Sequence, residues 1–396
     1  MTSISRSGSP KETTPRRGFE PAHSALTSQV PLSSPEKPDP SRARRFLFLA
    51  SIGFTVILLV CFEAGFRIYL FHFASPGRLN KYARSWDIPA DARKFKPHPY
   101  LNHALNERYR SEDGLNRHNA LGFRGAEFPR EKLPGTYRIA CLGGSSTYET
   151  KIADYRSAYP DQLQEVLRSA YGRTNVHVIN AGVAGYTSWE LLINLQLRVL
   201  DLSPDLIVIY EATNDVQARL VPPAQYLRDG TGHRKPWEPS GYGWWDHSLV
   251  LRFAGLKLGF SAPSSLDSTI NVEHGDPERP GDWLSRNPPV YLADNLRDMV
   301  AVTRAHGASI MFSSWTHRGR GAGKAPDPAY LRGLEENNET IRRVAEEEGV
   351  PFYDHASEMP QDDAYWADER HVNEKGALRK AELFAAFIEA KFLVAR

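Results

Sequence analysis

The sequence predicts an α/β fold, with a five-stranded parallel sheet between layers of helices and an apolar helix near the N-terminus. Two observations predict the sheet. After residue 136, short apolar segments typical of strands alternate with segments whose apolar residues recur at helical spacing. The segment PDLIVIYEATND, from Pro204 to Asp215, also contains an uninterrupted apolar strand, as expected of a strand covered on both faces. Such alternation favours parallel strands joined by right-handed crossovers.

The individual elements follow from local patterns. The first strand is TYRIACL, at residues 136–142, and two glycines follow it. The first helix begins at Pro160, because proline suits the first helical position, and Gly172 closes it. Besides the strand within 204–215, the other predicted strands are 176–182, 308–315 and 350–356, and the other predicted helices are 189–200, 292–306, 331–348 and 373–393.

The N-terminal region divides into a polar tail and an apolar run. Residues 1–41 are rich in Ser, Pro and basic residues and contain few large apolar ones, so we expect a disordered tail. Three arginines between residues 42 and 45 then precede 17 uncharged residues, from Phe46 to Phe62. That length is at the short end for a bilayer span, and charged residues near the ends can extend it. We predict a transmembrane helix within residues 42–73, and a buried core helix is the alternative.

The arginine cluster directly before the apolar run favours a cytoplasmic N-terminus. The chain is then a single-pass protein of a cell inner membrane, with the remainder in the periplasm or outside the cell. A cleavable signal peptide is disfavoured, because the polar leader is too long and no A-x-A site follows. Cys61 and Cys141 lie in apolar surroundings, so we expect core residues rather than a disulfide pair.

Two further regions lack a clear periodic pattern. Residues 74–136 are expected to connect the membrane helix to a domain at 137–396. Within them, RHNALGFRG (117–125) is either a loop packed beside a site or plain surface, and we favour surface. Residues 216–290 form an insert in the domain that is rich in Gly, Pro and Trp, and a segment of that length is unusual unless functional, for example as a cover of a site. Its aromatic residues form either a sugar-binding platform or, as we favour, a small satellite core: Trp237, Tyr242, Trp244 and Trp245.

Several predicted strand ends carry glycines or polar residues. After the first strand, Gly143 and Gly144 permit backbone angles that a side chain would forbid, and Ser145 follows them. Open α/β sheets bind their ligands at the carboxyl ends of the strands, so these positions are the candidate site. The other stretches of this kind are NAGVAG with Gly185, Thr213-Asn214-Asp215, and DERH from Asp368 to His371.

In order and spacing, these four stretches resemble the sequence blocks of the SGNH hydrolases, also called the GDSL esterase/lipase family, over about residues 137–393. The resemblance implies a flavodoxin-like three-layer sandwich and ester hydrolysis. It makes Ser145 the nucleophile, and the residue types agree, since acyl transfer needs a hydroxyl and a base. His371 is that base, and Asp368 can reach its other ring nitrogen. The oxyanion hole implied by the family uses the N–H groups of Ser145 and Gly185 and the amide of Asn214.

Two positions depart from the family pattern. Gly144 stands where the family usually has Asp, and Ala212 stands where a glycine is common. Neither change removes a catalytic group, and both leave the substrate preference open. Ser146 is a second candidate nucleophile, which alignment to the family disfavours. His317 and His355 match no family block, so we assign them no role.

The predicted activity is that of a membrane-anchored serine esterase that removes acyl groups, such as acetyl, from a cell-surface or exported carbohydrate or lipid. An O-acetyltransferase that acts on an exopolysaccharide with the same triad is the second hypothesis, because only the acceptor of a shared acyl-enzyme differs. A catalytically silent glycan-binding or scaffold module is the third.

The chemistry requires no metal or organic cofactor, and no Cys/His spacing suggests zinc. A net charge of +2 without a basic block predicts no nucleic-acid partner.

Overall fold

The computed structural model describes residues 40–84, 87–233, 243–261, 280–318 and 328–394. The chain divides into two compact units, 1–60 and 61–396. Most of the predicted tail, together with Trp237 and Tyr242, lies outside the described residues.

The N-terminal helix α1 (Pro40–His72) is continuous. From Ser41 to His72 it is long and apolar enough to cross a membrane, and its most apolar part is fully exposed. Cys61 is exposed on this helix, so its predicted place in a core was wrong, whereas Cys141 is buried, and both are free thiols.

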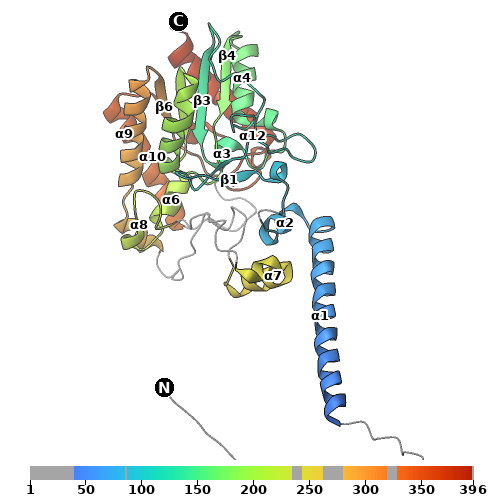
Figure 1. Cartoon of the computed structure of the whole chain (residues 1–396). Coiled ribbons are helices and arrows are strands. Elements are labelled where there is room, and N and C mark those ends of the chain that lie inside the picture. Colours follow the sequence, from blue (N-terminus) through green and yellow to red (C-terminus); the bar gives the residue numbers. More distant parts are fainter. Residues whose placement is uncertain (1–39, 85–86, 234–242, 262–279, 319–327, 395–396) are drawn as a thin grey trace, which may run out of the picture. The chain divides into compact units, whose positions relative to one another are not determined.

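The second unit contains a five-stranded parallel sheet (Figure 1) in the order β4-β3-β5-β6-β7. Numbered along the chain, this order is 2-1-3-4-5, the flavodoxin-like arrangement, and the prediction is confirmed. Every residue of β3 and β5 is buried, because these inner strands are covered on both faces. The strands are β3 (Tyr137–Gly143), β4 (Val176–Asn180), β5 (Leu206–Tyr210), β6 (Ser309–Ser313) and β7 (Phe352–Tyr353).

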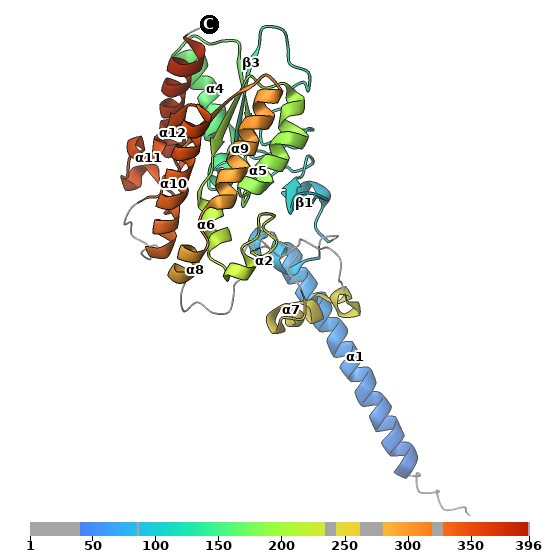
Figure 2. The same ribbon diagram turned by 90° about the vertical axis from the view of Figure 1, so that its left-hand side faces the viewer.

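Helices form a layer on each face of the sheet. Figure 2 shows α4 and α12 on one side and α5 and α9 on the other. Helix α10 packs against α9 and β6. The result is the predicted three-layer sandwich. The bounds of these helices are α4 (Tyr159–Ser169), α5 (Ser188–Asn194), α9 (Val290–Ala305), α10 (Pro328–Glu348) and α12 (Glu374–Ile388).

The observed elements differ from the predicted ones mainly at their ends. Wider π-type turns follow two helices, Leu195–Val199 after α5 and Glu389–Leu393 after α12. The last strand keeps only two of the seven residues predicted at 350–356, because Asp354 is already the N-cap of the short helix α11 (His355–Glu358).

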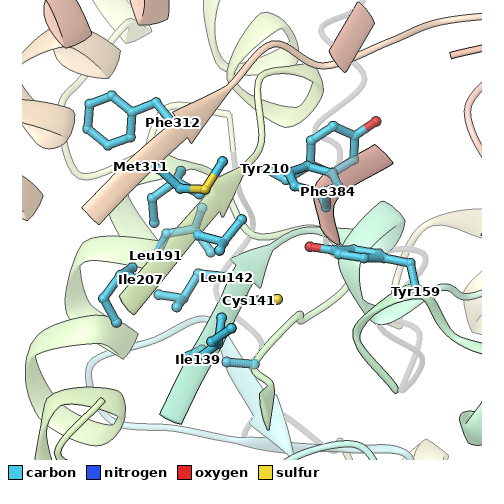
Figure 3. Close-up of a cluster of buried hydrophobic side chains, with 14 of the residues drawn as sticks. Ile139, Cys141, Leu142, Tyr159, Leu191, Ile207, Tyr210, Met311, Phe312 and Phe384 are labelled. Carbon is cyan, nitrogen blue, oxygen red and sulfur yellow. The ribbon is translucent and has the colours of Figure 1, made fainter. Parts of the chain in front are cut away.

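The main core lies between the sheet and its helices, and Figure 3 shows part of it, including Cys141, Tyr210 and Phe384. The rings of Tyr159 and Phe384 stack with their centroids 5.5 Å apart. The region before the sheet also contributes, since Leu105 is buried in this core. It belongs to an antiparallel pair, β1 (Phe95–Pro97) and β2 (His103–Leu105).

The segment 117–125, for which we favoured a surface position, is largely buried, so that prediction was wrong. Arg124 is only 2% exposed. The buried ring of His118 has Nδ1 2.8 Å from the carbonyl oxygen of Asn106 and Nε2 2.9 Å from the hydroxyl of Tyr148. Burial lowers the pKa of His118 to about 3, so the ring is neutral. The polar character of the segment suggested surface, but protein partners replace water here.

The described part of the 216–290 insert begins within α6 (Thr213–Arg219) and contains α7 (Leu249–Leu258) and α8 (Pro280–Arg286). Leu249 of α7 forms a second, smaller cluster with Leu70, Ala83 and Ile88. This cluster is not the aromatic satellite core that we favoured, since Trp245 is not among its residues. Trp244 does not belong to it, because this side chain is 76% exposed.

Candidate active site

Ser145 lies two residues after Gly143, the last residue of β3, and is the first residue of the short helix α3 (Ser145–Tyr148). The carbonyl of Gly144 accepts hydrogen bonds from the N–H groups of Thr147 at 3.1 Å and Tyr148 at 3.0 Å. The chain therefore changes from strand to helix within one residue, and it leaves the half-buried Ser145 at the edge of the sheet where such folds bind ligands.

The structure shows a second reason for glycine at positions 143 and 144. Neither has a positive φ, and Gly144 has φ −84° and ψ −142°. A Cβ on Gly143 would overlap with the side chain of Thr147, and a Cβ on Gly144 would overlap with the carboxyl of Glu211 and the amide of Asn214. These glycines allow close approach of neighbouring groups rather than a left-handed backbone.

Three of the predicted site residues form one hydrogen-bonded line. Nε2 of His371 lies 2.8 Å from Oγ of Ser145. Its Nδ1 lies 2.9 Å and 3.0 Å from the two carboxylate oxygens of Asp368. In the tautomer that fits both contacts, Nδ1–H donates to Asp368 and Nε2 accepts from the hydroxyl of Ser145.

Asp368 is held by more than the imidazole. Its Oδ1 also accepts hydrogen bonds from the backbone N–H of Arg370 at 2.9 Å and of His371 at 2.8 Å. Burial acts to raise the pKa of Asp368, but the hydrogen bonds from His371 and Arg370 outweigh it and hold this pKa well below its ordinary value. The Lys151 ammonium lies 3.2 Å from Oδ2 and favours the same ionised form.

The neighbouring Ser146 points elsewhere. Its side chain is buried, and its hydroxyl donates to the carbonyl oxygen of Arg370 at 3.4 Å. Of the two candidate nucleophiles, Ser145 is therefore the one whose hydroxyl contacts the imidazole of His371.

The candidate oxyanion donors come from two neighbouring turns. Gly185 follows β4 and has φ +83°, a backbone conformation that favours glycine. Asn214 lies in the first turn of α6, where its Nδ2 donates to the carbonyl oxygen of Tyr186 at 2.8 Å and lies 3.4 Å from Oε2 of Glu211. The overlap that a Cβ on Gly144 would make with Nδ2 of Asn214 shows that this amide lies beside the residue that precedes Ser145.

Other residues from the predicted blocks have structural contacts. Asp215 accepts hydrogen bonds from the backbone N–H of Ser188 at 2.9 Å and from its hydroxyl at 2.6 Å, which holds the start of α5. His355 is fully buried and stacks on Phe384 with ring centroids 5.2 Å apart. Burial lowers the pKa of His317, whose ring lies 5.9 Å from that of Tyr330.

Glu211 is a site residue that the sequence analysis missed. It is 2% exposed, and its Oε1 accepts from the backbone N–H of Asn214 at 2.8 Å while Oε2 accepts from that of Gly144 at 2.9 Å. Burial raises the pKa of Glu211 to about 8, although these hydrogen bonds oppose the change. A glutamate at the end of an otherwise apolar strand was the signal that could have identified it.

A buried ion pair lies under α3 and was also missed. Nζ of Lys380 lies 2.6 Å from Oε1 of Glu149 and donates to the carbonyl oxygen of Ser146 at 2.9 Å. Both side chains are almost completely buried. The guanidinium of Arg124 donates to the carbonyl oxygens of Tyr148, Glu149 and Ile152. These contacts hold the residues that follow Ser145, because buried polar groups lose water and need protein partners.

The sheet has a flavodoxin-like topology, and a serine, a histidine and an aspartate lie in hydrogen-bond contact at its carboxyl edge. The sequence model of the GDSL-like lipase/acylhydrolase family matches residues 141–379. The chain belongs to this family, and it is a hydrolase that acts on esters. The predicted SGNH hydrolase fold is thereby confirmed.

Solved structures of low sequence identity resemble the chain. The lipase/acylhydrolase from Enterococcus faecalis is 19% identical, with a TM-score of 0.40, and the match covers 65% of this chain and 97% of that one. The acetyl xylan esterase AlAXEase is 13% identical, with a TM-score of 0.39, and the match covers 63% and 99%. An acetyl xylan esterase variant from Geobacillus stearothermophilus is 15% identical, with a TM-score of 0.38, and the match covers 65% and 95%. Comparison with curated protein sequences gives no match.

Proposed function

We propose that the chain is a membrane-anchored serine esterase in which Ser145, His371 and Asp368 form the catalytic triad. The observation that carries the proposal is the pair of contacts made by the His371 ring, 2.8 Å from Ser145 and 2.9 Å from Asp368. Residues 226 positions apart in the chain are brought within hydrogen-bond distance, and a silent binding module would not need this arrangement.

The proposed chemistry is acyl transfer through an acyl-enzyme. Oγ of Ser145 attacks the ester carbonyl while Nε2 of His371 takes its proton, and the same imidazolium then gives the proton to the leaving alcohol. Asp368 stabilises that imidazolium and fixes the tautomer. The oxyanion is stabilised by the N–H groups of Ser145 and Gly185 and by the amide of Asn214.

The proposed substrate is an acyl ester, such as an acetyl ester, of a cell-surface or exported carbohydrate or lipid. The exposed apolar helix α1 supports anchoring in the inner membrane, with the hydrolase domain on the periplasmic or outer side. The proposed enzyme is an esterase because the acyl-enzyme transfers its acyl group to water. Product analysis with an acetyl donor and a polysaccharide acceptor tests for transfer to sugar instead.

The test compares two adjacent serines. In Ser145→Ala, we expect loss of p-nitrophenyl acetate hydrolysis and of fluorophosphonate labelling, with an unchanged circular dichroism spectrum. Ser146→Ala is the matched control and should keep both, since its hydroxyl contacts only the backbone of Arg370 among the groups described. Full hydrolysis by Ser145→Ala would refute the assigned nucleophile.

A further inference from the structure

The carboxylate of Glu63 lies in α1 directly after the uncharged run that ends at Phe62. It accepts hydrogen bonds from the hydroxyl of Ser248 at 2.7 Å and from the backbone N–H groups of Leu249 at 2.9 Å and Val250 at 3.1 Å. Arg67, one turn later, pairs with it at 2.7 Å. Glu63 therefore caps the N-terminus of α7, and a charge next to a membrane segment is satisfied by protein groups.

Side-chain packing fixes α7 against the end of α1 and against α2 (Pro76–Tyr82). The ring of Phe253 contacts that of Phe66 at 5.5 Å between centroids and that of Tyr82 at 5.0 Å. Arg252 is buried, pairs with Asp246 at 3.0 Å and donates to the carbonyl oxygen of Tyr82 at 3.2 Å. The orientation of α7 relative to residue 63 is thus set by many contacts.

The opposite face of α7 is apolar and exposed. Leu251 is 44% exposed and Leu258 is 69% exposed, and residues seven apart lie on the same face of a helix. Phe260, just after the helix, is 76% exposed. Helix α7 and the neighbouring α2 also carry exposed cationic side chains: Arg78, Lys81 and Lys257. Apolar side chains flanked by aromatic residues and lysines are typical of helices that lie in a membrane interface.

We propose that α7 lies in the boundary between headgroups and acyl chains of the bilayer that α1 crosses, with Leu251, Leu258 and Phe260 inserted and Lys257 among the lipid phosphates. This proposal rests on the proposed membrane anchoring. The run from Phe46 to Phe62 has 17 residues, which as a helix span about 26 Å, close to the roughly 30 Å of a hydrocarbon core. The end of that run, where Glu63 caps α7, is then at the bilayer boundary.

Under this proposal, the exposed apolar face of α7 lies at the same boundary of the bilayer at which the apolar run of α1 ends. The exposed cations suit anionic phosphates, which a purely apolar protein partner would not need. The part of the insert that carries α7 then has a role in holding the domain close to the membrane surface.

The experiment uses the full chain with Cys61→Ser in nanodiscs of phosphatidylcholine and phosphatidylglycerol. Cys141 stays in place, because its thiol is buried and not accessible to the label. One further cysteine at a time is introduced, as Leu251→Cys, Leu258→Cys or Phe260→Cys, and it carries a nitroxide. The collision rates of the nitroxide with oxygen and with a water-soluble nickel chelate report its depth. Leu378→Cys, at an exposed leucine of α12, is the matched aqueous control. Thr55→Cys reports the anchor itself.

We expect the three α7 positions to favour oxygen over nickel at least several-fold more than position 378 does. If the α7 positions are as accessible to nickel as position 378 while position 55 lies in lipid, the α7 proposal is overturned and the anchor stays intact. An aqueous position 55 would overturn the anchor itself and the α7 proposal with it. Labels shielded from both reagents would reveal a protein partner on this face, which also contradicts lipid insertion.

Discussion

The backbone N–H of Gly144 donates a 2.9 Å hydrogen bond to Oε2 of Glu211, and the same carboxyl fills the space that a side chain at position 144 would need. The resembled family usually has an aspartate before its nucleophile. In this chain Gly144 stands at that position, and the carboxyl beside it comes from Glu211, which follows the neighbouring strand β5. Since Oε1 of Glu211 also accepts from the backbone of Asn214, one side chain holds the turn before Ser145 and the candidate oxyanion donor.

This arrangement predicts that Glu211→Gln lowers kcat with little change in KM. A glutamine amide can accept only one of the two N–H hydrogen bonds, so the oxyanion donors lose their alignment. We expect kcat to fall by at least about 10-fold, but by less than the roughly 10²–10³-fold that is typical of removing a whole oxyanion donor. Steady-state kinetics on p-nitrophenyl acetate measures both constants.

Glu211→Ala removes both acceptor oxygens and should lower kcat at least as much as Glu211→Gln does. Glu335→Gln, at an exposed glutamate of α10, is the control and should behave as the parent. Parent-like kinetics in Glu211→Gln would show that this carboxyl does not position the site.

Glu211 also predicts a pH dependence of stability. Burial raises its pKa to about 8 in the native state, whereas the unfolded chain ionises near the ordinary value. The protonated Glu211 therefore contributes fully to the free energy of unfolding below the unfolded-state pKa. This contribution is lost as the pH rises through about 8, by up to about 1.4 kcal/mol per pH unit. Urea unfolding between pH 5 and 9 should show a smaller decline for Glu211→Gln than for the parent, and equal declines would contradict the prediction.

Asn214→Ala tests the amide proposed for the oxyanion hole. Its amide would stabilise charge that exists only in the transition state, so kcat should fall about 10²–10³-fold while KM changes little. Asn338→Ala is the control, since this amide binds both backbone groups of Trp315 in the same fold. That control should lose stability without a comparable loss of kcat. A rise in KM alone for Asn214→Ala would instead indicate substrate binding.

Lys380→Met should destabilise the protein by about 3–5 kcal/mol, because it leaves the buried carboxyl of Glu149 without its partner. Adding Glu149→Gln to it should recover part of the free energy of unfolding, since an amide avoids the buried charge. Urea denaturation measures both variants. A loss below about 1 kcal/mol for Lys380→Met would mean that water or relaxation replaces the ion pair.

Local pattern was sufficient for most of the elements. The apolar runs of β3 and β5 and the helical spacing of α4 are properties of short segments, so their type was predicted correctly. The last strand was overestimated, because it pairs with β6 at two residues and then ends at Asp354, the N-cap of α11. The segment 117–125 was misjudged, since its polar residues find partners only from other segments of the chain.

The sequence by itself determined the alternation of strands and helices, the apolar helix, and the motif positions of Ser145, Asp368 and His371, because each depends on residues close together in the chain. Only the tertiary structure decided that His371 reaches Ser145 across 226 positions, that Glu211 takes the space beside Gly144, and that Glu63 caps α7. Contacts between distant segments depend on how the sheet and its crossovers bring them together, and no local pattern contains that information.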